Sequence, residues 1–394
     1  MYDKEIVLQL LQYALLIESN DDDFFNQHKY WQIEWEEVYL FFREHSMTAF
    51  LSNIIKYIPE DNMGIKTAWK EDVYTNIYSY ARLLKRQKHI LDSLLTHKIP
   101  TVVVKGTSAA KYYPNPQLRT MGDIDLLVKP ECYNNAIQCL MDIGCEETTG
   151  VADIRSGRHR SFSYKDTSID LHCVYSSKVN RDKASTIDNL VFNAIPDNGT
   201  VLPDDINGIA LLTHIGHHME EGLGLRQIID WFMFVRACLD DEMWFFSFQE
   251  KARSTGLEAL AITVTRMCQI HLGLTTENIT WCRDADETVC NELMQYVLDC
   301  GNFGRSREML QSSAVEKLPS IKHPIQLFKY IQSHGEKNWK ALKKHPWLKP
   351  FAWIYQSCRY IKLAIQNKVT PNKLKAIYDE GNKRNEMFAA LGLK

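Results

Sequence analysis

Two aspartates, Asp123 and Asp125, stand one residue apart at the head of the apolar segment 124–128. Successive side chains of a β-strand alternate between faces, so both carboxylates are expected to point the same way. Neighbouring carboxylates repel each other, and a hard divalent cation such as Mg²⁺ relieves the repulsion by taking both as oxygen ligands. The spacing therefore predicts a divalent-metal site where this strand begins.

A glycine turn, Lys105-Gly106-Thr107-Ser108, follows the β-branched run 99–104, which is typical of a short buried strand. A turn that leads into a helix offers backbone N–H groups and a positive dipole end to phosphate. Gly106 lets the backbone approach a ligand closely. Lys105 adds a cation, and the two hydroxyls add donors. We therefore expect phosphate to bind at this turn.

A third carboxylate, Asp170, lies in the alternating segment 168–175, which predicts a third strand. Three carboxylates can hold two Mg²⁺ ions, which stabilise the attacking and leaving oxygens of an in-line phosphoryl displacement. Arg119, four residues before Asp123, adds a guanidinium that can neutralise phosphate charge. His172, on the strand of Asp170, is interpreted as a partly buried histidine, with a position lining the site as the alternative.

The ordered pattern K-G, R-x-x-x-D-I-D-L-L-V and I-D-L-H resembles that of the polymerase-β-type nucleotidyltransferases. More narrowly, it is similar to a poorly characterised bacterial nucleotidyltransferase family in which a KG turn replaces the more usual GS turn. The motif covers about residues 99–175, and segments 214–218 and 225–230 also resemble that family's helical region. We identify no such resemblance in residues 1–95 and 300–394.

The resemblance implies that Asp123 and Asp125 bind two metal ions, Mg²⁺ or alternatively Mn²⁺. It implies that Asp170 binds the catalytic metal and helps to deprotonate an acceptor hydroxyl. The implied reaction moves an NMP from an NTP to a hydroxyl or phosphate acceptor and releases pyrophosphate. The residues expected to bind the nucleotide are Lys105, Gly106, Thr107, Ser108 and Arg119.

The elements that must position these residues differ along the chain. Helical periodicity is present in residues 3–95 and again from about residue 205, whereas the strand signals lie in residues 96–180. We therefore predict a mostly helical α+β protein with a small mixed-sheet nucleotidyltransferase core at 96–180. An N-terminal helical region (1–95) and a C-terminal helical region (181–394) would flank this core.

Three histidines, His214, His217 and His218, share one helix face at i, i+3 and i+4. This spacing can bind a transition metal, but it lacks the glutamate of the H-E-x-x-H arrangement. A face that hydrogen-bonds to the core or lines the nucleotide cleft is favoured. Arg226 and Asp230, at i and i+4, are interpreted as a helix ion pair, with an orienting role near the cleft as the alternative.

Charge is distributed unevenly. The net charge is −3, which gives no global attraction to nucleic acid. Residues 305–394 nevertheless contain 18 Lys+Arg and 6 Asp+Glu, which leaves about −15 for residues 1–304. This basic tail interleaves aromatics and cations at 345–353. A solvated helix face is the default interpretation, and binding to an anionic acceptor, RNA or a membrane surface is the alternative.

The compartment is also predicted from the sequence. Ten cysteines without a C-x-x-C pair indicate reduced thiols in a cytoplasmic protein. The charged N-terminus does not resemble a secretory signal, and no run of 18 apolar residues predicts a transmembrane segment.

Two other functions fit the D-x-D pair. A metal-dependent glycosyltransferase would use it to hold a nucleotide-sugar, but it would need several βα units before the pair and would leave the KG turn and Asp170 unexplained. A non-catalytic nucleotide-binding or interaction protein of the same fold is the other alternative. The pattern specifies the donor half of the reaction, and the acceptor is a small molecule, a protein or RNA.

Overall fold

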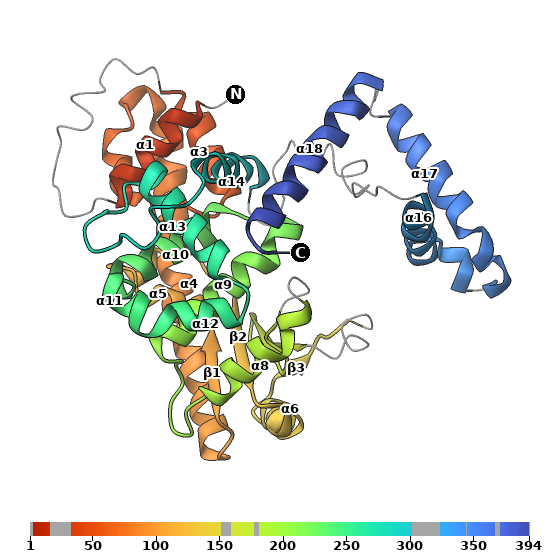
Figure 1. The fold of residues 1–394 in the computed structure, drawn as a ribbon. Coiled ribbons are helices and arrows are strands. Elements are labelled where there is room, and N and C mark those ends of the chain that lie inside the picture. Colours follow the sequence, from red (N-terminus) through yellow and green to blue (C-terminus); the bar gives the residue numbers. More distant parts are fainter. Residues whose placement is uncertain are drawn as a thin grey trace. The chain divides into compact units, whose positions relative to one another are not determined.

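The computed structural model divides the chain into two compact units (Figure 1). The larger unit comprises residues 1–304 and 391–394, and the smaller unit comprises residues 305–390. The three-part division at residues 95 and 180 stays a prediction. The structure describes residues 3–15, 33–150, 159–176, 181–301, 324–343, 345–366 and 371–393.

The described residues of the larger unit contain a mixed five-stranded sheet in the order β1-β2-β5-β4-β3. β2 and β5 are parallel, and the other neighbouring strands are antiparallel. This small sheet in a mostly helical chain confirms the predicted α+β class. The strands are β1 (Thr101–Val104), β2 (Asp123–Val128), β3 (Glu146–Glu147), β4 (His159–Tyr164) and β5 (Thr167–His172).

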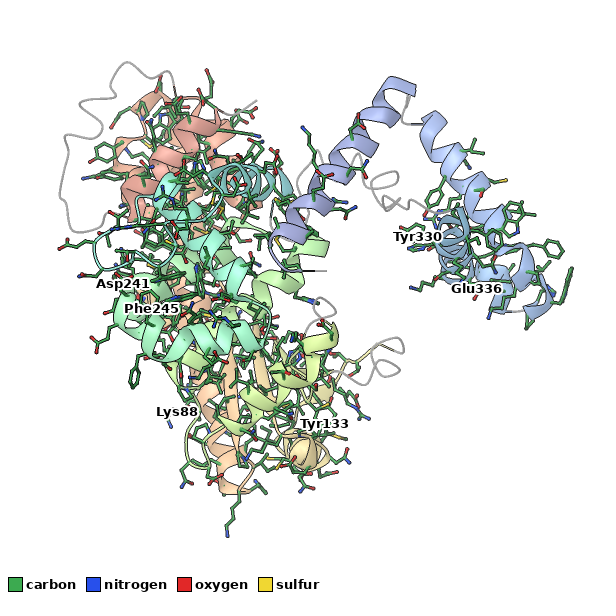
Figure 2. The ribbon with its side chains drawn as sticks, in the orientation of Figure 1. Lys88, Tyr133, Asp241, Phe245, Tyr330 and Glu336 are labelled. Carbon is green, nitrogen blue, oxygen red and sulfur yellow. The ribbon has the colours of Figure 1, made fainter. Side chains whose placement is uncertain are left out.

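Apolar side chains cover both faces of the sheet. Ile124, Leu126 and Val128 of β2 pack in one cluster with helices α4 (Met63–Thr96) and α6 (Tyr133–Asp142). Tyr133, labelled in Figure 2, donates from its hydroxyl to the carbonyl oxygen of Leu171 at 3.4 Å. A slip of one residue would exchange the faces, so this packing fixes the register of β2.

The opposite face of the sheet holds a second apolar cluster. Leu127 of β2 and Val104 of β1 pack there with α8 (Ala184–Asn193) and α9 (Asp204–Glu221). Asp123 and Asp125 alternate with the residues of the first cluster, so both carboxylates belong to the α8–α9 face.

Helix α4 is long because its 34 residues contain neither proline nor an internal stop signal. It ends at Thr96, before Lys98 with its φ of 57° and before Pro100. The remaining helices surround a helical core that includes buried Trp69 and Trp231. The helical elements outside the sheet layers are α1 (Lys4–Leu15), α3 (Trp35–Glu44), η1 (Ser52–Tyr57), η2 (Glu60–Asn62), α5 (Gly106–Ala110), η3 (Pro116–Leu118), η4 (Pro130–Cys132), η5 (Arg181–Lys183), α10 (Leu225–Cys238), α11 (Asp241–Met243), η6 (Trp244–Phe248), α12 (Gln249–Ser254), α13 (Glu258–Leu272) and α14 (Glu287–Cys300).

The smaller unit carries the predicted basic tail. Its α16 (Pro324–Asn338) and α17 (Ala352–Gln366) pack against each other, and the rings of Trp339 and Tyr355 stack with centroids 5.1 Å apart. The other elements are η8 (Lys340–Lys343), η9 (Pro346–Phe351) and α18 (Pro371–Ala390). Among the described helices, none has both the length and the apolar character that crossing a membrane requires.

Candidate metal and nucleotide site

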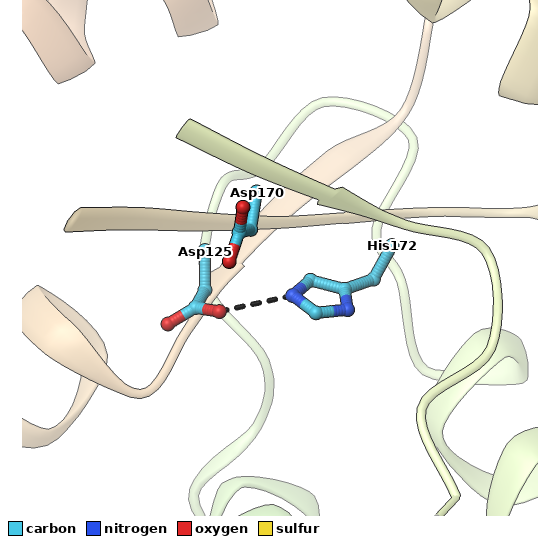
Figure 3. Close-up of side chains that lie close together, drawn as sticks. All are labelled: Asp125, Asp170 and His172. Atoms are coloured by element: carbon cyan, nitrogen blue, oxygen red, sulfur yellow. Dashed lines mark hydrogen bonds and ion pairs between the residues drawn. The ribbon is translucent and has the colours of Figure 1, made fainter. Parts of the chain in front are cut away.

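Three side chains that can bind metal converge on two neighbouring strands. β2 and β5 run parallel, and Asp125 pairs in register with Asp170. Asp170 and His172 are two residues apart and so share a face of β5. One ligand atom from each of Asp125, Asp170 and His172 lies within 4.8 Å of the other two (Figure 3). Two carboxylates and an imidazole can together hold one divalent cation.

Asp125 is the most constrained member of this group. It is 5% exposed, and its Oδ1 accepts hydrogen bonds from Lys105 Nζ at 2.8 Å and from His172 Nε2 at 2.9 Å. Burial favours the neutral acid, but the Lys105 ammonium and the His172 hydrogen bond outweigh it and hold the pKa of Asp125 well below its usual range. The carboxylate is therefore ionised at neutral pH, and an ammonium group compensates its charge.

Asp123 lies at the exposed start of β2, outside the three-ligand group. Partial desolvation of the carboxyl and the like charge of Asp125 raise its pKa to about 6, although Lys105 opposes this shift. A second cation bound to Asp123 would relieve this repulsion between the two carboxylates.

Asp170 is oriented by a neighbouring strand. Ser161 of β4 lies opposite Asp170 in the antiparallel register, and its hydroxyl donates to Asp170 Oδ1 at 2.6 Å. This serine was not among the predicted site residues, because the pairing of β4 with β5 was not predicted. For His172 the partly buried interpretation was favoured over a position lining the site, although its two-residue spacing from Asp170 already placed both on one face of the strand.

The KG turn joins β1 to α5. Lys105 and Gly106 both have positive φ, 57° and 30°, so the turn needs backbone conformations that favour glycine. The Thr107 hydroxyl donates to Gln87 Oε1 at 2.9 Å, and the buried Ser108 hydroxyl donates to Asn207 Oδ1 at 2.7 Å. Both hydroxyls thus fix the turn between α4 and α9, and their predicted contact with phosphate stays a prediction.

Arg119 is buried in an ion pair on the side of α10. Its Nε and Nη2 donate to the two carboxylate oxygens of Asp230, each at 2.7 Å, and Tyr113 adds a third hydrogen bond to Asp230 at 2.7 Å. Arg226 donates to the carbonyl oxygen of Thr120 at 3.1 Å. The structure thus engages Arg119 with Asp230, and its predicted phosphate role stays a prediction.

The three histidines of α9 lie next to one another. The rings of His214 and His218 are 4.4 Å apart, and those of His217 and His218 are 5.4 Å apart. Burial, together with neighbouring histidines and Lys105, lowers the pKa of His214 well below its usual value and that of His218 to about 3. The rings of His214 and His218 are therefore neutral at pH 7. The three-ligand group found among the described residues includes none of the three histidines.

The chain matches a known protein family. The model of a family described as "Uncharacterised nucleotidyltransferase" matches residues 32–273, more than half of the chain. The matched segment contains the whole sheet, the KG turn, the three-ligand group and helices α9 and α10. It begins at residue 32, so the match also includes most of the N-terminal helical region, where no resemblance was identified from the sequence. Neither a curated protein nor a solved structure matches the chain.

Proposed function

Because the chain belongs to this uncharacterised nucleotidyltransferase family, we propose that the transferase uses Asp125, Asp170 and His172 to bind a divalent metal ion. The reaction moves an NMP from an NTP to a hydroxyl or phosphate of an acceptor and releases pyrophosphate. The observation that carries this proposal is the convergence of three ligand groups, from paired strands, inside the segment that the family model matches.

The chemistry of the donor set fits a divalent cation. Carboxylate oxygens suit Mg²⁺, and Mn²⁺ accepts both carboxylate and imidazole ligands. Asp125 is ionised and already faces a positive charge, the Lys105 ammonium at 2.8 Å. A bound ion would supply charge neutralisation and polarisation of the phosphoryl group. Asp123, on the same face of β2, is the proposed ligand of a second ion.

The KG turn is the proposed binding site for the triphosphate. Its helix α5 is placed by hydrogen bonds from Thr107 to α4 and from Ser108 to α9. The first-turn N–H groups of a helix lack intrahelical acceptors, so they can donate to phosphate oxygens. Lys105 supplies a cation next to these groups, and phosphate would compete with Asp125 for its ammonium.

Asp170 is the proposed acceptor of the proton from the attacking hydroxyl. Its Oδ1 already accepts a hydrogen bond from Ser161, which limits the orientations that the carboxylate can adopt. Such positioning of the reacting groups, together with charge neutralisation, would supply most of the rate enhancement.

The fold supports a polymerase-β-like assignment more than a glycosyltransferase. A nucleotide-sugar site needs several βα units before the D-x-D pair, whereas β1 is the one strand that precedes β2 in the described residues. No such sheet is needed here. Antiparallel pairing of β1 with β2 brings the KG turn to Asp125, and parallel pairing of β2 with β5 brings Asp170 beside it.

Metal binding by the purified full chain tests this proposal. We expect Mn²⁺ titration, followed by electron paramagnetic resonance, to show binding that Asp125→Asn and Asp170→Asn each weaken at least tenfold. Asp142→Asn, an exposed aspartate at the end of α6, is the matched control and should bind like wild type. Unchanged Mn²⁺ affinity in both site variants would contradict the assignment.

A further inference from the structure

A pocket of about 480 Å³ lies between η1 and the first half of α4. Its volume falls in the range of pockets that bind small molecules, about 300–1,000 Å³. Its lining residues come from these two elements: Ser52, Ile55, Lys56, Lys66, Lys70, Val73 and Tyr74.

Three lysines and no carboxylate line this pocket. Lys66 and Lys70 are four residues apart on α4, where like charges destabilise a helix by a few tenths of a kcal/mol. Lys66 Nζ donates to the carbonyl oxygen of Ile58 at 3.0 Å, so this ammonium is held at the base of η1. Lys56 lines the opposite wall, where its ammonium lies 4.7 Å from the centroid of the Tyr57 ring. An anion between the two walls would relieve the repulsion.

The remaining lining is apolar and aromatic. Ile55 and Val73 are buried, whereas Tyr74 is 69% exposed and so is not needed by the core. An exposed aromatic ring beside a cluster of cations suits a ligand that has a planar or apolar part next to its negative charge.

The pocket is separate from the carboxylate site. Thr107 of the KG turn contacts α4 at Gln87. Lys70 precedes Gln87 by 17 residues on the same helix, which corresponds to about 25 Å along its axis. One NTP bound at the KG turn would not fill this pocket, so a ligand here is a second molecule.

We propose that this pocket binds a small phosphate ester of about mononucleotide size. The lysine ammonium groups and the Ser52 hydroxyl would contact phosphate oxygens, and the planar part would lie against Tyr74 and Val73. The net charge of about −15 on residues 1–304 opposes a long polyanion, so a ligand with few phosphates is favoured. This inference does not depend on the chemistry proposed for the carboxylates.

Isothermal titration of the full chain with AMP and with inorganic phosphate tests the site, in EDTA so that the carboxylate site lacks metal. We expect AMP to bind more tightly than phosphate, and Lys70→Glu to raise the Kd for AMP at least tenfold. Tyr74→Ala should weaken AMP and leave phosphate binding unchanged. Lys88→Glu, an exposed lysine further along α4 (Figure 2), is the control and should bind like wild type.

Three results would overturn the inference. The first is no AMP binding by the wild type, and the second is equal AMP affinity of the wild type and Lys70→Glu. The third is that a 12-nucleotide adenosine oligoribonucleotide binds at least tenfold more tightly than AMP and that this binding depends on Lys70. The last result would assign the pocket to a polynucleotide. A failure of Mn²⁺ to bind at the carboxylates would change none of these AMP and oligonucleotide measurements. Failure of the metal-site proposal can therefore be told apart from failure of the pocket proposal.

Discussion

The buried ion pair between Arg119 and Asp230 makes stability, rather than phosphate binding, the property that Arg119→Ala should change first. The side chains of Arg119 and Asp230 are 5% and 2% exposed. The substitution removes two hydrogen bonds of 2.7 Å and leaves the carboxylate of Asp230 buried with the Tyr113 hydroxyl. Removing one partner of a buried pair costs about 3–5 kcal/mol, a large part of a typical stability of about 5–15 kcal/mol.

Urea unfolding followed by tryptophan fluorescence measures this effect, because Trp231 neighbours Asp230 in sequence and is buried. The double variant Arg119→Met/Asp230→Leu removes both charges and should recover much of the loss, since apolar replacement of a buried pair is often neutral. Arg160→Ala is the matched control. Its side chain is 36% exposed and lies 3.5 Å from Glu147, so a loss below about 1 kcal/mol is expected.

One result would refute this reasoning. If Arg119→Ala unfolds at the wild-type urea concentration but loses affinity for NTP, Arg119 acts as a phosphate ligand. The ion pair with Asp230 would then contribute little to stability.

Three further predictions concern titration and metal affinity. Burial lowers the pKa of His45 to about 4. The stability that neutral His45 contributes is therefore complete above about pH 6.5 and is lost as the pH falls through 4. In urea unfolding, the free energy of unfolding of His45→Gln should vary with pH by up to about 3 kcal/mol less than that of the wild type. Partial desolvation and the charge of Asp125 raise the pKa of Asp123 to about 6. The contribution of protonated Asp123 to folding stability is therefore complete below about pH 4 and is lost as the pH rises through 6. Asp123→Asn should raise the Tm of the metal-free protein at pH 8 and leave it unchanged at pH 4. Lys105→Met removes the ammonium that Asp125 binds and that competes with the metal ion for this carboxylate. Calorimetry should therefore show a Kd for Mn²⁺ lower by about tenfold. An unchanged Kd would mean that Lys105 does not compete with the ion.

Local patterns in the sequence predicted much of the sheet. The apolar run after Asp123 predicted β2, and the alternation around Asp170 predicted β5, because strand periodicity is a property of neighbouring residues. Glycine in the turn after β1 was also informative, because its conformational preference is local: Gly106 has a positive φ.

Partners that are distant in sequence were not predicted. Arg119 pairs with Asp230, which lies 111 residues away, and Ser108 donates to Asn207, which lies 99 residues away. Tertiary packing selects these partners: α9 packs against the sheet, and α10 packs against α9 and α5. No local spacing encodes them. The role of His172 depended on the parallel pairing of β2 with β5, which places its ring 2.9 Å from Asp125.

The fate of the NTP phosphates tests the central claim most directly. The full chain would be incubated with Mg²⁺ or Mn²⁺, NTP labelled at the α- or the γ-phosphate, and fractions of protein, RNA and small molecules as acceptors. Nucleotidyl transfer predicts that the α-label enters an acceptor, that the γ-label leaves in pyrophosphate, and that Asp170→Asn abolishes both. Transfer of the γ-label to an acceptor, turnover of a UDP-sugar in place of NTP, or wild-type activity of Asp170→Asn would contradict the assignment.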